Sequence, residues 1–187
     1  MMRLSYMFVS ACLFAHVSGC GDPAAPAPAA AKAAAPAKAA APASEAVGYD
    51  LRRLRPRDEE TLEAMFERLR TGALADGKRV MVLFSADWCE PCRTLDAELG
   101  NRHPRAMIED VRILELKEED WQAAARMDEF NALRKRWADH VGSYPLLVLL
   151  DAEGKRVEEM KEAIARLQAA EIEPTLANWI ADTRPTS

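Results

Sequence analysis

The sequence predicts an α/β domain with a central mixed sheet flanked by helices. Two continuous apolar runs, residues 80–84 and 146–150, are typical of strands buried on both faces. Other segments repeat apolar residues at the three- and four-residue spacing of amphipathic helices. The chain of 187 residues is longer than one domain of about 150 residues requires, and the extra length is visible at its N-terminus.

Residues 1–19 have the pattern of a secretory signal peptide. Arg3 is the only charged residue, and an apolar stretch follows that is too short for a permanent membrane span. The tetrapeptide Val17-Ser18-Gly19-Cys20 resembles a bacterial lipobox, in which the cysteine is acylated and becomes the new N-terminus. We therefore expect a lipoprotein signal peptide with lipid on Cys20. The alternative is an ordinary signal peptide that is cleaved elsewhere.

Residues 20–48 are expected to form a disordered linker between the lipid and a folded domain over residues 49–187. The segment is nearly all alanine and proline and has no large apolar side chain to nucleate a core. Such a linker would let the domain move next to a membrane, or it would serve only as a spacer that aids solubility.

The charge pattern argues against nucleic acid as a partner. The formal net charge is −5 at pH 7, and the sequence has no basic patch. Most charged residues fall on segments with helical apolar periodicity, which indicates solvated helix faces.

The first half of the domain is expected to alternate helix and strand. A helix over residues 58–73, with Asp58 as its N-cap, is followed by a strand over 79–85. A second helix begins at the cysteine motif and carries Leu95 and Leu99 on its apolar side. The chain then breaks near residues 100–104, and the last elements expected here are a short turn at 105–109 and a strand at 111–116.

The second half begins with a long helix expected over residues 119–139. Its candidate buried positions are Trp121, Ala125, Phe130, Leu133 and Trp137. The remaining expected elements are a strand over 146–150, a turn over 151–154, a short strand near 156–160 followed by a helix, and a final helix from Pro174 to Ala181.

Four cysteines are present, and each has a separate expected fate. Cys12 lies in the signal peptide and Cys20 takes lipid, so Cys89 and Cys92 remain as a pair. The preceding strand delivers Cys89 to a helix N-terminus, where free N–H groups favour the thiolate, and Cys92 lies one turn on. This arrangement suits thiol–disulfide exchange. A structural staple is the alternative, although a bridge over three residues restrains little of the unfolded chain.

These residues resemble the thioredoxin family over roughly residues 58–184. The segment Trp88-Cys89-Glu90-Pro91-Cys92 follows a buried strand, and Tyr144-Pro145 immediately precedes another. The stretches 86–89 and 95–99 are similar to the thioredoxin-like domains of periplasmic disulfide reductases linked to the membrane. Cys-Glu-Pro-Cys also resembles the membrane-anchored thioredoxins that reduce apocytochrome c.

The resemblance implies a thioredoxin-like fold and a division of roles between the cysteines. Cys89 would attack a partner's disulfide, and the more buried Cys92 would resolve the mixed disulfide. Pro91 would stiffen the first helical turn. Trp88 would cover the disulfide or would serve as an ordinary core aromatic.

The resemblance also implies a cis bond between Tyr144 and Pro145. Such a bend would place the Tyr144 backbone beside the cysteines, ready to pair with an extended substrate segment.

The sequence departs from the family at two places. Leu83 occupies the position, six residues before Cys89, where thioredoxins carry a buried acid, so Asp87, Glu90 or water must move the proton. Glu90 could instead be a solvated residue that complements the helix dipole. About fifty residues separate Cys92 from Pro145, which indicates an insertion near residues 119–139 that could bind a partner.

Three classes of function remain open. The first is a thiol–disulfide oxidoreductase of the bacterial cell envelope, facing the periplasm, that reduces protein disulfides and draws electrons from a redox partner. The second is a copper- or zinc-handling protein that adds His103 or His140 to the two cysteines. The third is a non-catalytic binding module. We expect a monomer without an organic cofactor or a resident metal.

Overall fold

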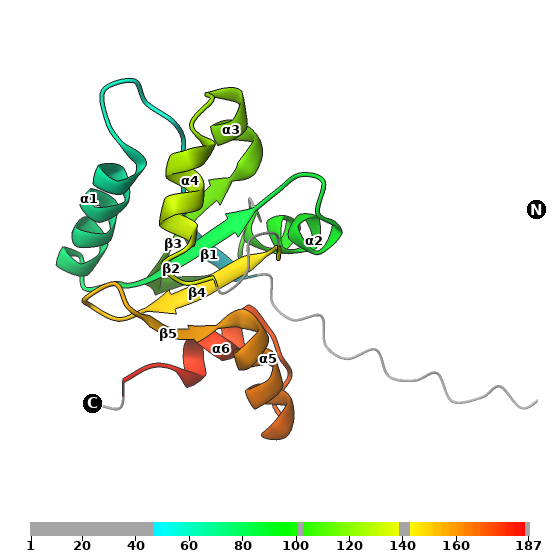
Figure 1. Ribbon diagram of the computed structural model, residues 1–187. Helices are drawn as coiled ribbons and strands as arrows, with labels where there is room; N and C mark the ends of the chain where they lie inside the picture. The colour runs from blue at the N-terminus through cyan, green and yellow to red at the C-terminus, as the bar shows by residue number, and fades with distance from the viewer. Residues whose placement is uncertain (1–46, 101–102, 139–142, 186–187) are drawn as a thin grey trace, which may run out of the picture. The chain divides into compact units, whose positions relative to one another are not determined.

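The computed structural model describes residues 47–100, 103–138 and 143–185. Its centre is a five-stranded sheet in the order β1-β3-β2-β4-β5 (Figure 1). The strands are β1 (Val47–Leu54), β2 (Arg79–Ser85), β3 (Ala106–Lys117), β4 (Leu146–Leu150) and β5 (Arg156–Glu159). β1 and β2 run parallel to β3, whereas β4 runs antiparallel to β2 and β5. The sheet is therefore mixed, as the sequence predicted.

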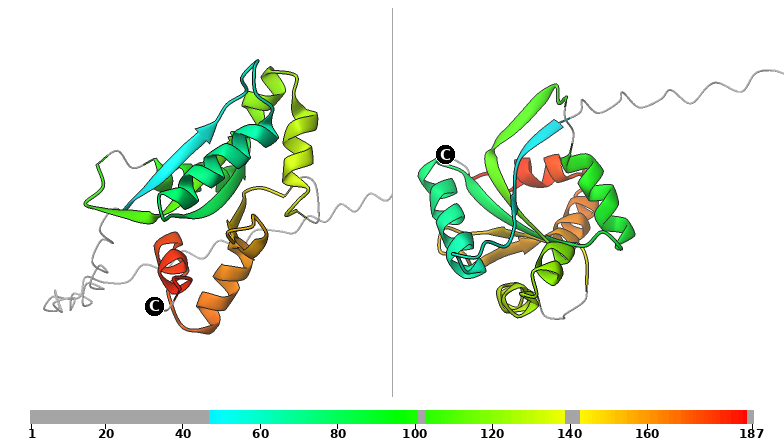
Figure 2. Two further views of the ribbon diagram at one scale, coloured as in Figure 1. Left: turned by 90° about the vertical axis from the view of Figure 1, so that its left-hand side faces the viewer. Right: turned by 90° about the horizontal axis from the view of Figure 1, so that it is seen from above.

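Helices cover both faces of the sheet (Figures 1 and 2). They are α1 (Leu62–Ala75), α2 (Glu90–Leu99), α3 (Glu118–Ala123), α4 (Met127–Arg134), α5 (Met160–Ala169) and α6 (Leu176–Asp182). Side chains of α1, α3 and α4 share one apolar core with Val82 and Phe84, and those of α2, α5 and α6 share another with Met81 and Leu83. Successive β2 residues thus face opposite layers, which explains why this strand is apolar throughout.

The two apolar runs are confirmed as the central strands β2 and β4. All five residues of β4 are buried, and β2 is buried from Val80 to Ser85. The short strand β5 and the helix α5 after it also follow the prediction. Among the described residues, no helix is long and apolar enough to cross a membrane.

The predicted start of the first helix at Asp58 was wrong. α1 begins at Leu62, because the Thr61 hydroxyl accepts a hydrogen bond from the Ala64 N–H at 3.2 Å and so caps the helix. The final helix likewise begins at Leu176 behind the N-cap Thr175, rather than at Pro174.

The single helix predicted over residues 119–139 was also wrong, because the segment forms α3 and α4 with a break between them. Ala125 has a φ of 55° and is exposed, although it was predicted to be buried. The N–H of Ala125 donates to the Gln122 carbonyl at 3.0 Å. The N–H of Arg126 donates to the Trp121 carbonyl at 2.9 Å. These two bonds form a Schellman motif that ends α3, with alanine where glycine is usual.

Two strand assignments differ from the prediction. Residues 106–109, expected as a turn, form the first part of β3. β1 was not predicted at all, and it begins at Val47, within the segment assigned to the linker. β1 pairs along β3 with a register shift after Tyr49, and its charged residues hide the alternation that marks a strand.

Candidate functional site

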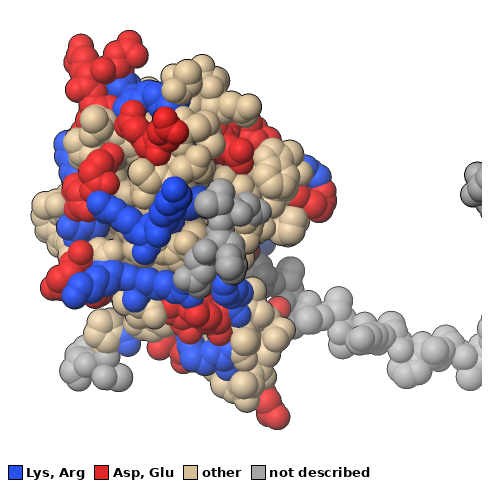
Figure 3. Space-filling model, viewed as in Figure 1, with Lys and Arg blue, Asp and Glu red and all other residues tan. Residues whose placement is uncertain are grey.

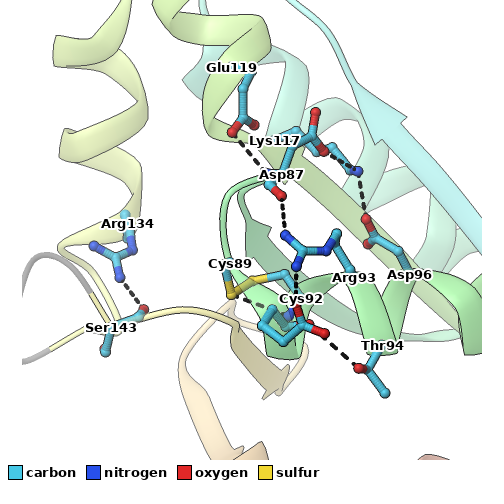
Figure 4. The surroundings of a disulfide bond; sticks show 11 residues. Asp87, Cys89, Cys92, Arg93, Thr94, Asp96, Lys117, Glu119, Arg134 and Ser143 are labelled. Carbon is cyan, nitrogen blue, oxygen red and sulfur yellow. Dashed lines mark hydrogen bonds and ion pairs between the residues drawn. A yellow bond between two sulfur atoms is a disulfide. The ribbon is translucent and has the colours of Figure 1, made fainter.

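Cys89 and Cys92 form a disulfide at the start of α2 (Figure 4). Their Cα atoms lie 5.2 Å apart, and Cys89 Sγ accepts a hydrogen bond from the Cys92 N–H at 3.2 Å. Cys89 is the N-cap of α2, and Pro91 lies in the first turn, where its missing N–H costs no hydrogen bond. Cys89 is 5% exposed and Cys92 is 0% exposed. Cys89 is therefore the more accessible residue of the two.

The loop before Cys89 is held by polar contacts from β3, α2 and α3 (Figure 4). Lys117 Nζ lies 2.8 Å from Asp87 Oδ1, and the Asp87 N–H donates to Glu119 Oε1 at 2.8 Å. Arg93 donates to the Asp87 carbonyl at 3.0 Å and also pairs with Glu90. These contacts fix the path of the chain into the cysteine motif.

Neither carboxylate proposed from the sequence as a proton acceptor is well suited to that role. The hydrogen bond from Lys117 lowers the pKa of Asp87, so its carboxylate holds protons less readily. Glu90 is exposed and its carboxylate pairs with Arg93. Its placement is that of a solvated residue at a helix N-terminus.

Trp88 and Tyr144 form an aromatic pair beside the cysteines. Trp88 is 63% exposed, so the reading of it as a core aromatic was wrong. Its ring centroid lies 5.4 Å from that of Tyr144, at an interplanar angle of 87°. Tyr144 also packs against the cluster of Ala86, Cys89 and Cys92. The bond between Tyr144 and Pro145 is cis, as expected from the resemblance.

Arg134 of α4 braces the Tyr144 loop, and sequence reasoning missed it. The side chain is 2% exposed, its guanidinium carbon lies 4.5 Å from the Tyr144 ring centroid, and it donates to the Ser143 carbonyl. Burial and a hydrogen bond with Glu118 raise the pKa of Tyr144. Arg134 follows Phe130 by four residues, on the buried face of the helix, and this spacing was the available signal.

Glu115 of β3 is a second buried charged residue that the sequence analysis missed. It is 4% exposed and pairs in register with Leu83 of β2, the position at which the family's acid was expected. Burial is the largest of the effects that raise the pKa of Glu115, and the neighbouring Asp96 adds to it. The signal was a single acidic residue between apolar neighbours in a predicted strand.

Metal ligands do not gather around the cysteines in the part of the chain that the structure describes. Within residues 47–100, 103–138 and 143–185, no group of three or more His, Cys, Asp or Glu side chains could hold a metal ion. His103 is exposed, and His140 lies outside the described residues. Cys20 lies outside them too.

The architecture and the site together define a class of protein. A mixed sheet between two helical layers carries a cysteine pair at a helix start, and a cis-proline loop lies beside that pair. This is the thioredoxin fold of a thiol–disulfide oxidoreductase. A family model described as a thioredoxin-like domain matches residues 68–174, and the chain belongs to that family.

Solved structures are similar to the chain at low sequence identity. A poplar thioredoxin h, PtTrxh4, is 15% identical, with 72% of this chain and 99% of that chain covered and a TM-score of 0.38. A disulphide isomerase from Xylella fastidiosa Temecula1 is 18% identical, with 70% and 98% covered and a TM-score of 0.41. No curated protein matches the chain.

Proposed function

We propose that this protein reduces disulfide bonds of exported proteins in the bacterial cell envelope while lipid on Cys20 tethers it to a membrane. The observation that carries the chemistry is the disulfide between Cys89 and Cys92 at the start of α2, next to the Tyr144 loop. The lipobox-like tetrapeptide ending at Cys20 supports the tether. The proposed domain plan is a signal peptide over residues 1–19, a linker that begins at residue 20 and a redox domain that includes β1 from Val47 onward.

The first step uses the reduced protein. The Cys89 thiolate attacks one sulfur of a substrate disulfide, and the second substrate sulfur leaves as a thiolate that takes a proton from water. Cys89 is suited to the attack because its sulfur is at the helix N-cap, where backbone N–H groups stabilise a thiolate. Cys89 is also the more accessible residue of the pair.

The second step releases the product. Cys92 loses its proton and attacks Cys89 Sγ, which breaks the mixed disulfide and expels the substrate's first sulfur as a thiolate. The protein is then left with the disulfide between Cys89 and Cys92. A dithiol partner returns two electrons and two protons to regenerate it.

Substrate recognition is assigned to the surface next to the disulfide. Tyr144 lies beside the cysteines, and its backbone can pair with an extended substrate segment. The exposed ring of Trp88 offers apolar contact area at the same place. We propose that Glu90 and Pro91 shape the helix start and that the protein acts as a monomer.

Reductase activity tests the chemical part of the proposal. The purified full chain should reduce insulin disulfides with dithiothreitol as electron donor, and Cys89→Ser should abolish that activity. Cys92→Ser, reduced beforehand and mixed with insulin after removal of the dithiothreitol, should instead accumulate a mixed disulfide through Cys89, visible as a mass increase. An unchanged activity in Cys89→Ser would overturn the assignment.

Lipidation is tested separately in bacterial cells. The wild-type chain should incorporate radiolabelled palmitate and sediment with membranes, whereas Cys20→Ser should do neither. Equal incorporation in both chains would contradict the tether and would leave the redox assignment intact.

A further inference from the structure

Strand β1 forms one open edge of the sheet. It stands at the end of the strand order and pairs with β3 on one side, and within the described part of the chain no strand covers its other side. An edge strand carries N–H and C=O groups that point away from its neighbour, and an extended peptide can pair with them. The outer side of β1 is therefore able to accept a further strand.

A hollow of about 420 Å³ lies beside this edge, between β1 and α1. Its apolar lining consists of Leu51 from β1 and of Met65 and Leu69 from α1. A peptide in this hollow would gain side-chain contacts with these residues in addition to backbone pairing with β1.

The rest of the lining is basic. It consists of five arginines: Arg52, Arg53, Arg55, Arg57 and Arg68. No acidic side chain lines the hollow, although the chain as a whole has a formal net charge of −5. The expectation that the chain has no basic patch was therefore wrong at this place. Four of the arginines are close in sequence, and the fold brings Arg68 of α1 beside them.

The charges of these arginines are only partly neutralised by neighbouring carboxylates. Three have partners at 2.8–2.9 Å: Arg52 with Asp50, Arg53 with Asp120, and Arg68 with Glu60. Arg55 lies 3.9 Å from Asp120, which already pairs with Arg53, and Arg57 makes no salt bridge with any described residue. Both side chains are exposed. Two guanidinium groups can thus bind carboxylates of a ligand.

The hollow lies toward the end of the sheet that carries the disulfide. β1 and β2 both run parallel to β3, so their carboxyl ends meet at one edge of the sheet. β1 ends at Leu54, which pairs with Leu116, and β2 ends at Ser85, which pairs with Lys117. Arg55 follows the end of β1 as the cysteine loop follows the end of β2. A partner held by Arg55 and Arg57 would lie at the same end of the sheet as Cys89.

We propose that this hollow binds an extended, carboxylate-rich segment of a protein partner, which adds a strand to β1 and pairs its carboxylates with Arg55 and Arg57. Single-stranded nucleic acid fits less well, because it is bound through aromatic stacking and no aromatic side chain lines the hollow. An anionic membrane surface would meet the arginines but would leave the apolar lining and the strand edge unused. The binding involves no thiol, so it goes beyond the proposed reductase activity and does not depend on it.

Fluorescence anisotropy with the full chain tests this binding. The probe is a fluorescein-labelled peptide of alternating glutamate and valine, without cysteine, at about 50 mM NaCl. Arg55→Glu combined with Arg57→Glu should weaken its binding at least about tenfold. Lys135→Glu combined with Lys155→Glu is the matched control: it makes the same change in net charge at two exposed residues that do not line the hollow, and should change the affinity less than about twofold. A peptide with glutamine in place of glutamate should bind at least about tenfold more weakly.

Hydrogen exchange of the wild-type chain locates the peptide and does not depend on the variants folding. The glutamate peptide should slow amide exchange in residues 47–57, which include β1, and the glutamine peptide should not.

Three results would overturn the proposal. The first is equal weakening in the two double variants, which would indicate general charge attraction. The second is slowed exchange only outside residues 47–57. The third is binding to phosphatidylglycerol vesicles without binding to the peptide, which would assign the arginines to a membrane surface. Each would leave the redox assignment intact, because the probe has no cysteine.

Discussion

Replacing Arg134 by methionine should destabilise the protein and weaken its hold on protein substrates. The substitution keeps an unbranched side chain in the buried space and removes the guanidinium that donates to the Ser143 carbonyl. It also removes the cation–π contact, in which the guanidinium carbon lies 4.5 Å from the Tyr144 ring centroid. We therefore expect a looser Tyr144 loop beside an intact cysteine pair.

The size of the expected loss in the free energy of unfolding follows from three contributions. A hydrogen bond from a charged donor contributes about 1.5–3 kcal/mol, and the cation–π contact about 0.5–2 kcal/mol. The third contribution has the opposite sign. Arg134 Nε is buried without a partner among the described residues, which destabilises the wild-type protein by about 1–3 kcal/mol, and methionine removes that cost. The net loss in the free energy of unfolding should be about 1–2 kcal/mol.

Urea unfolding followed by circular dichroism measures this loss, with Arg136→Met as the matched control. Arg136 lies two residues on, is exposed, and pairs with Glu63 and Glu67 at the surface, so its replacement should cost about 0–1 kcal/mol. Arg134→Met should also raise the KM for insulin several-fold and leave the reaction with Ellman's reagent unchanged. Equal losses in both variants, or slower reaction with the small reagent, would refute the bracing role.

Further predictions concern stability. Asp50→Asn should lower the free energy of unfolding at pH 7, because the ionised carboxylate pairs with Lys78 and Arg112 in the folded protein. Burial by itself would raise the pKa of Asp50, but the hydrogen bonds from Lys78 and Arg112 outweigh burial and lower the pKa. Because the folded pKa is below the unfolded value of about 3.9, the difference from wild type should fade as pH drops below about 4 in acid-titrated urea melts. Thr61→Ala should cost about 1 kcal/mol in thermal melts, whereas Asp58→Ala should cost less than about 0.5 kcal/mol. The opposite order would restore the predicted helix start.

Glu115 should give the free energy of unfolding a pH dependence opposite to that from Asp50. Because its pKa is raised in the folded protein, ionising it costs stability, and that cost grows as pH rises through the folded pKa. The free energy of unfolding of Glu115→Gln relative to wild type should therefore increase from pH 4 to pH 8. A constant difference over that range would contradict the buried, raised-pKa carboxyl.

The fold could be predicted where burial leaves a plain pattern. β2 and β4 are apolar throughout because helices cover both faces of the sheet. β1 could not be predicted, since it is an edge strand with charged residues that pair with β3 far along the chain. The break at Ala125 could not be predicted either. α3 and α4 pack into the same core, so their apolar residues keep the spacing of a single helix across the break.

The candidate site was predictable only in part for a related reason. Cys89, Cys92 and the Tyr144 loop carry motifs that mark them in the sequence. Glu115 and Arg134 are charged, and sequence patterns assign such residues to solvated faces. Their burial depends on neighbours brought together by the fold, Leu83 of β2 in one case and Tyr144 in the other. Other charged side chains do lie at the surface, and acidic and basic ones are mixed on the face seen in Figure 3.

The central claim is that Cys89 and Cys92 form a reducing dithiol, and their reduction potential tests it most directly. The full chain would be equilibrated in graded dithiothreitol buffers, and alkylation of both cysteines would be counted by mass spectrometry. The account predicts one reversible two-electron transition near the potential of thioredoxin, about −270 mV. A potential near that of a strong oxidant, about −120 mV, would contradict the reductase assignment, and the absence of a reversible transition would contradict redox function altogether.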